Sequence, residues 1–148
     1  MNWIKYWMLS FKERAAKGGY VCEEEKTYPG SFCTTLKGFG NVNVNVFTDK
    51  DSLAEFLQEI GFCGESEEVA RQHNGLAWHL ENYKEGKSAF IMYLPDLSDI
   101  RTIYHECLHT GWHVLAFLGI EVDADNHEVL AYLQSHLADE VLQHKSQK

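Results

Sequence analysis

The sequence lacks three features that would place it in common protein classes. It has no apolar run of the roughly 20 residues that a membrane span requires. Its first nine residues, MNWIKYWML, are interrupted by Lys5 and are followed by no small-residue cleavage pattern, so we expect no export signal. The four cysteines (22, 33, 63 and 107) form no C-x-x-C pair. These absences predict a cytoplasmic protein with reduced thiols and no transmembrane segment.

Basic residues are also scarce. The chain has 13 Lys and Arg against 22 Asp and Glu, which gives a net charge of −9. Residues 1–17 hold four of the basic side chains and one acidic one, so the remaining chain is more acidic than the whole. Proteins bind the phosphates of nucleic acids through clustered Lys and Arg. We therefore expect no direct nucleic-acid binding by the main body of the protein.

The length and the organisation of the chain indicate one domain over residues 1–148. A chain of 148 residues can bury a sizeable core, and no internal repeat, low-complexity tract or long linker divides it. Residues 1–17 place apolar side chains at helical spacing and predict an amphipathic N-terminal helix. We expect this helix to dock on the domain; binding to a membrane or partner surface is the alternative.

The patterns along the chain predict an α+β fold with a small twisted sheet. NVNVNVF alternates valine with asparagine, which is typical of a half-buried strand. Acidic residues at its start and a glycine at its end mark DKDSLAEFLQEIG as a helix. The expected elements are β-structure from 20 to 47 with a strand at 41–47, helices at 49–61 and 66–73, a hairpin of 76–82 with 88–94, and helices at 97–118 and 126–143.

The helix at 97–118 carries a candidate metal site. His105 and His109 are four residues apart, about 40° around a helix and one turn along it, so both imidazoles can reach one ion. Catalytic zinc takes three protein ligands and leaves one position open for water. Glu106 lies about 100° from His105, beside the ion rather than on it, where a general base would act. We interpret Cys107 as a core residue, and Leu108, Leu115 and Leu118 as part of the apolar face.

His-Glu-x-x-His alone is a short pattern that also arises by chance on exposed helices. Here it lies in an amphipathic helix that follows a predicted hairpin and precedes a second helix bearing a carboxylate. This context favours a functional site.

The motif resembles that of the zincin metallopeptidases. The metzincin variant is excluded, because the positions of its glycine and its third histidine hold Trp112 and Leu115. His113 extends the row of histidines, but it lies two turns, or about 12 Å, from His105 and cannot bind the same ion. We therefore expect His113 to be structural or to support a ligand.

The gluzincin variant takes its third ligand from the next helix, and Glu128 occupies the matching place. The resemblance therefore implies Zn²⁺ held by His105, His109 and Glu128. Glu128 has an alternative role, because Asp125-x-x-Glu128 also fits a capping box. Reserve ligands in the same loop are Asp123, Asp125 and His127.

The resemblance covers about residues 88–140, which would form the metal-site core. Within it, the layout H-E-x-x-H…D-x-x-N-x-E-x-x-A-Y-L is similar to small phage-encoded proteins and to minimal ImmA/IrrE-type peptidase cores. A phage origin would place the protein in the host cytoplasm. Many gluzincins have an aspartate four residues after the ligand Glu, to hold a zinc histidine; here that residue is Tyr132, and either it or another group takes this role.

The resemblance implies a zinc metallopeptidase acting on a peptide or protein. Glu106 would be the general base, and strand 88–94 would be a sheet edge that pairs with extended substrate, unless it is an ordinary buried strand. The alternative is an inactive zinc-binding interaction protein, or a virion-associated one. Oligomeric state is not predicted. Candidates for stabilising the oxyanion are Tyr104, Tyr132, His136, His79 and Arg101.

Overall fold

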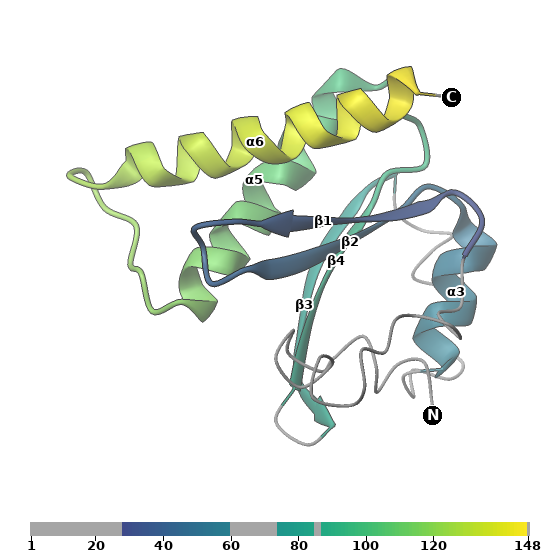
Figure 1. The fold of residues 1–148 in the computed structure, drawn as a ribbon, viewed down its shortest axis with the longest axis horizontal. Coiled ribbons are helices and arrows are strands. Elements are labelled where there is room, and N and C mark those ends of the chain that lie inside the picture. The colour runs from purple at the N-terminus through teal and green to yellow at the C-terminus, as the bar shows by residue number, and fades with distance from the viewer. Residues whose placement is uncertain (1–27, 60–73, 85–86, 148) are drawn as a thin grey trace.

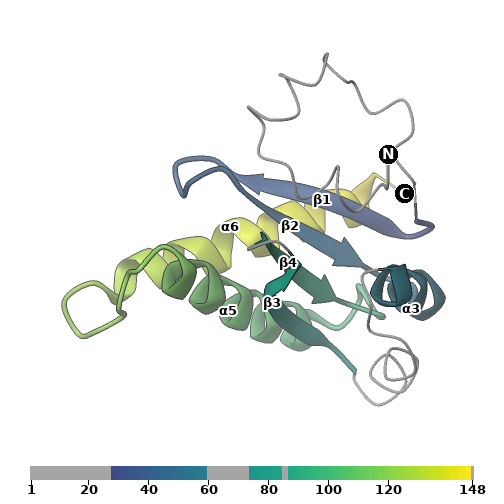
Figure 2. The ribbon, with the colours of Figure 1, turned by 90° about the horizontal axis from the view of Figure 1, so that it is seen from below.

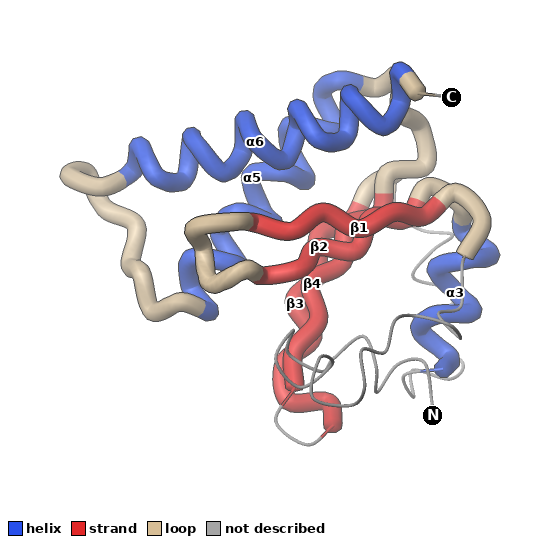
Figure 3. Tube along the Cα trace, in the orientation of Figure 1, coloured by secondary structure: helices blue, strands red, loops and turns tan. Residues whose placement is uncertain are grey.

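The structure is a computed structural model that describes residues 28–59, 74–84 and 87–147 (Figures 1 and 3). The strands of these described parts are β1 (Ser31–Leu36), β2 (Val42–Phe47), β3 (Leu76–Lys84) and β4 (Lys87–Tyr93), and their helices are α3 (Lys50–Glu59), α5 (Ile100–Phe117) and α6 (His127–Ser146). The predicted α+β class is confirmed. Among the helices of these parts, none has both the length and the hydropathy of a membrane span.

The strands form one sheet in the order β1-β2-β4-β3, which twists strongly from β1 to β3 (Figure 1). β2 and β4 pair in parallel, and the other two neighbouring pairs are antiparallel. The predicted hairpin is confirmed as β3 and β4. The prediction that strand 88–94 is a sheet edge is wrong, because β4 has β2 on one side and β3 on the other. Its continuous apolar run is typical of a strand buried on both faces, and β3 is the edge beside α5.

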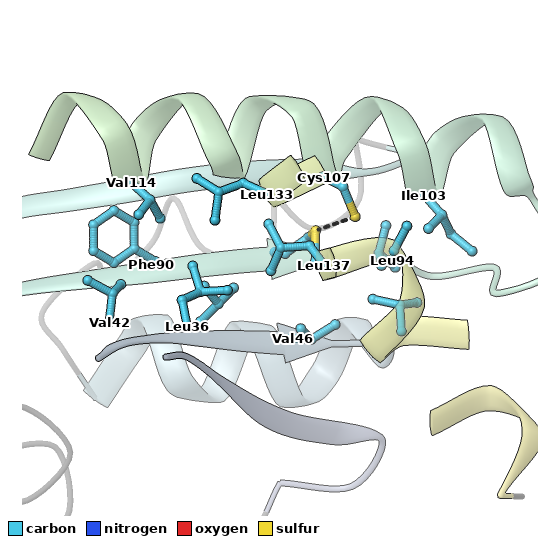
Figure 4. Close-up of a cluster of buried hydrophobic side chains, with 14 of the residues drawn as sticks. Leu36, Val42, Val46, Phe90, Leu94, Ile103, Cys107, Val114, Leu133 and Leu137 are labelled. Carbon is cyan, nitrogen blue, oxygen red and sulfur yellow. Dashed lines mark hydrogen bonds between the residues drawn. The ribbon is translucent and has the colours of Figure 1, made fainter. Parts of the chain in front are cut away.

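Alternating side chains of the sheet build two apolar layers. Val42, Val44 and Val46 of β2 point to the face covered by α5 and α6, where they pack with residues such as Phe90 and Leu133 (Figure 4). The opposite face packs against α3 and is a separate cluster, composed of Tyr28, Phe47, Leu53, Phe56, Leu57, Leu80, Ile91 and Tyr93. The predicted strand at 41–47 is thus confirmed as β2, and its period of two separates the layers.

Helices α3 and α5 each begin after an aspartate whose carboxylate accepts a hydrogen bond from a backbone N–H group of the first turn. Asp49 precedes α3, and its Oδ2 accepts hydrogen bonds from the N and Oγ of Ser52 at 2.9 and 3.1 Å. The predicted helices at 49–61, 97–118 and 126–143 correspond to α3, α5 and α6. The predicted helices at 1–17 and 66–73 lie outside the described residues.

Cys107 belongs to the buried layer under α5, as predicted. Its Sγ lies 3.9 Å from Met92 Sδ, and its side chain is fully buried (Figure 4). Burial, followed by the negative charge of neighbouring Glu106, raises the pKa of the Cys107 thiol to about 12. Cys107 is a free thiol.

Candidate metal centre

The histidine pair lies on the exposed side of α5. Asp99 caps this helix, because its carboxylate accepts hydrogen bonds from the N and Oγ1 of Thr102 at 3.2 and 2.7 Å. The opposite side of the helix is buried against the sheet and α6 through Ile103, Cys107, Thr110, Gly111, Val114 and Leu115. This burial fixes the rotation of the helix, so that His105 and His109 face outward.

The two imidazoles converge on each other. The Nε2 atoms of His105 and His109 are 3.2 Å apart, and the rings are inclined by 72°. Two nitrogen ligands at about 2.0–2.1 Å from a tetrahedral zinc ion lie about 3.3 Å apart, so the pair already has the separation that a shared ion requires. The residues present therefore fit two of the three protein ligands of a zinc site.

Glu106 occupies the side of α5 that faces the edge strand. Its side chain is only 8% exposed, although the neighbouring histidines are open to solvent. Gly75, just before β3, lies so close that a Cβ there would be 3.1 Å from Glu106 Oε1. The carboxyl group thus lies between the helix and the start of the edge strand, beside the histidine pair, as the helical spacing predicted.

Helix α6 crosses α5 close to the histidines. A Cβ on Gly111 would be 3.3 Å from both Leu130 Cδ1 and Leu133 Cβ, so the glycine permits the close approach of the two helices. Gln134 Nε2 donates a hydrogen bond to the carbonyl oxygen of Tyr104 at 2.9 Å, immediately before His105. The helix that bears Glu128 is therefore fixed against the part of α5 that bears the histidines.

Glu128 itself is exposed in the first turn of α6. Within the described residues, no three His, Cys, Asp or Glu side chains are grouped to hold a metal ion. The structure thus brings His105 and His109 together and does not bring Glu128 to them; its role as a ligand stays a prediction. The alternative capping box is not formed, because α6 is capped at Asn126 and Glu128 is only the second residue of the helix.

The reserve ligands lie in the loop before α6. Oδ1 of Asp123 accepts hydrogen bonds from the N atoms of Asp125 and Asn126, at 2.8 and 3.0 Å, so this carboxylate stabilises the turn. Asp125 and His127 are exposed. The aspartate and the asparagine of D-x-x-N therefore have a structural role that the sequence pattern did not reveal.

The candidates for the oxyanion donor lie in different environments. Tyr132 is 74% exposed on α6, and its predicted catalytic role stays a prediction. Tyr104 is 40% exposed, and His136 and Arg101 are also exposed. His79 instead stacks on Phe90, with ring centroids 4.3 Å apart, in the layer between β3 and α5.

His113 lies in the same layer. Its ring centroid is 6.3 Å from that of His79, and its side chain is partly buried. This packing agrees with the prediction that His113 is structural rather than a ligand of the ion at His105.

A row of exposed apolar side chains runs along α5 beside the histidines. The α5 apolar row consists of Ile100, Tyr104, Leu108 and Trp112, which are 45%, 40%, 37% and 51% exposed. They recur every four residues, so they share one side of the helix. The expectation that Leu108 belongs to the buried apolar face is wrong, since the helix turns Leu115 inward and Leu108 outward. The four-residue spacing of these apolar residues was the feature of the sequence that could have revealed the exposed row.

The side of α5 that faces the solvent thus has three parallel features. Around the helix axis, the α5 apolar row lies on one flank of the histidine pair and Glu106 lies on the other. The edge strand β3 runs beside α5 (Figure 2). Comparisons of the chain with protein-family models, with curated proteins and with solved structures found no match.

Proposed function

We propose that the protein is a zinc-dependent metallopeptidase. The observation that carries the proposal is the convergence of His105 and His109, whose Nε2 atoms are 3.2 Å apart beside the buried carboxyl of Glu106. A structural zinc site has no need of an adjacent general base. We propose Glu128 as the third ligand, on a helix that Gln134 already ties to Tyr104.

The histidines hold the ion, and Glu106 moves the proton. When bound, zinc polarises a carbonyl group and lowers the pKa of coordinated water. Glu106 accepts a proton from the water that adds to the scissile carbonyl carbon. It then delivers that proton to the amine nitrogen as the C–N bond breaks, so that water is added across the peptide bond. The position of Glu106, beside the pair and close to β3, supports both transfers.

The substrate that fits this arrangement is an extended peptide. β3 is an edge strand of the described sheet and lies against the helix that bears the histidines, so an extended peptide that adds to this edge would lie beside them. In the pairing of β3 with β4, Ala77 lies opposite Met92 and His79 lies opposite Phe90. Ala77 and His79 therefore share the face of the sheet toward α5. The α5 apolar row, on the far flank of the histidines, favours peptides with large apolar side chains near the cleaved bond.

The same exposed row favours one alternative, a non-catalytic module in which the ion only stabilises the fold and the apolar row binds a partner protein. A phage or virion protein of this kind, acting in the cytoplasm, is included in this alternative. The two functions differ in their need for Glu106: the peptidase requires it as a general base, and the non-catalytic module does not.

Glu106→Gln separates the two functions. The variant is nearly isosteric, and Glu106 is not a proposed ligand, so zinc content should equal that of the wild type. Hydrolysis of an unbiased peptide library, read by mass spectrometry, should fall by about 10²–10⁴-fold. His105→Ala is the matched control and should lose both zinc and hydrolysis. If the wild type with zinc bound cleaves no peptide, or Glu106→Gln cleaves as fast, the peptidase proposal is wrong.

A further inference from the structure

Gly75, just before the edge strand β3, lies against the side chain of Glu106. A Cβ at this position would lie 3.0 Å from Glu106 Cγ and 3.1 Å from Glu106 Oε1. It would also lie 2.5 Å from Thr102 Cγ2, one turn earlier on α5. All three separations are shorter than ordinary contacts of a Cβ, so any side chain at this position requires the side chain of Thr102 and that of Glu106 to move.

We propose that Gly75 is a positioning residue for Glu106. Without a side chain at position 75, the chain just before β3 lies against the carboxyl group of Glu106, which is only 8% exposed, and holds it beside the histidine pair. The inference rests on the proposed peptidase function, because a general base must be held at a defined place to transfer a proton.

Close packing of helix and strand would also select glycine here, and the contacts allow the two causes to be separated. Thr102 Cγ2 is the first atom that a Cβ at position 75 meets. Thr102→Ser removes that methyl group and keeps Oγ1, which donates to Asp99 at the start of the helix. In a Thr102→Ser background, Gly75→Ala therefore acts mainly on Glu106.

The comparison is between Thr102→Ser and Thr102→Ser/Gly75→Ala, both loaded with zinc. Glu106 labelled with ¹³C should change its side-chain rotamer, measured by three-bond couplings. Because a displacement of about 1 Å can reduce a rate about 10²-fold, kcat should fall by about 10- to 100-fold, while KM stays within about twofold. Aspartate is one methylene shorter than glutamate and leaves room for the alanine Cβ. In a Glu106→Asp background, Gly75→Ala should therefore lower kcat by a smaller factor than it does when Glu106 is present.

Gly111→Ala is the control for packing, because its Cβ meets Leu130 and Leu133 and not Glu106. It should lower the stability and leave the rotamer of Glu106 unchanged. If Thr102→Ser/Gly75→Ala keeps the rotamer and the kcat of Thr102→Ser, the inference about Gly75 is wrong and the peptidase function stands. If neither Thr102→Ser nor the wild type cleaves any peptide, the proposed function fails, and the positioning role fails with it.

Discussion

Asp123 and Asn126 bind each other across the turn that leads into α6. The N atom of Asp123 donates to Oδ1 of Asn126 at 2.7 Å, and the N atom of Asn126 donates to Oδ1 of Asp123 at 3.0 Å. Asn126 Nδ2 also donates to the carbonyl oxygen of Glu121 at 2.6 Å. This reciprocal pair determines where α6 begins, and so where Glu128 stands relative to α5.

The roles of the two carboxylates can be separated by mutation. Glu128→Ala should weaken zinc binding by at least about tenfold, because it removes the proposed third ligand. Asp123→Ala removes the acceptor of two N–H groups and should lower the free energy of unfolding, with zinc affinity changed much less. Calorimetric titration with zinc and thermal unfolding of both variants measure these effects. If Asp123→Ala alone released the metal, Glu128 would not be the ligand.

The edge strand should report substrate binding. On addition of a peptide that the Glu106→Gln variant binds but does not cleave, the backbone amides of residues 76–80 in β3 should shift in NMR spectra. β1 is the other edge of the sheet, beside β2 and away from α5, and its amides serve as the control. Shifts confined to β1 would place the peptide at the wrong edge for cleavage at the histidines.

Trp112 should contribute to substrate binding more than to stability. It is 51% exposed, so Trp112→Ala should change the free energy of unfolding by no more than about 0.5 kcal/mol. KM for peptides with large apolar side chains should rise several-fold, whereas kcat should change little. Phe117→Ala is a suitable comparison, because Phe117 has a similar exposure of 49% but packs edge-on against the rings of His79 and Phe90. That variant should lose stability and keep KM.

The burial of Cys107 predicts a specific dependence of stability on pH. Its pKa is raised to about 12 in the folded state, against about 8.5 for an unfolded thiol. The resulting stabilisation is complete below the unfolded pKa and is lost as pH rises toward 12, because only the unfolded thiol ionises in this window. The stability difference between wild type and Cys107→Ala should therefore shrink by up to about 1.4 kcal/mol per pH unit above pH 9. Urea unfolding at pH 7, 9 and 10.5 measures it, and a constant difference would contradict the prediction.

Short-range patterns predicted the elements well, because they depend on local chemistry. The alternation of Val42, Val44 and Val46 identified β2, and the four-residue spacing of His105 and His109 predicted the convergence of their imidazoles. The prediction that strand 88–94 is a sheet edge was wrong and its alternative, a buried strand, is confirmed. The parallel pairing of β2 with β4 joins segments more than 40 residues apart and leaves no local signal in the sequence.

The surroundings of the site were the part that sequence reasoning missed. The approach of Gly75 to Glu106 arises only when β3 packs beside α5, and nothing near Gly75 in the sequence indicates it. The direction of Leu108 was misjudged, because a helix with apolar residues on two sides does not reveal which side faces the sheet.

X-ray absorption at the zinc K edge, on protein loaded with one equivalent of zinc, identifies the ligands of the ion. We expect two imidazole nitrogens at about 2.0–2.1 Å, together with oxygen ligands at similar distance. His105→Ala should reduce the imidazole contribution and release most of the metal. A spectrum without imidazole scattering, or one that His105→Ala leaves unchanged, would contradict the assignment of His105 and His109 as the zinc-binding pair.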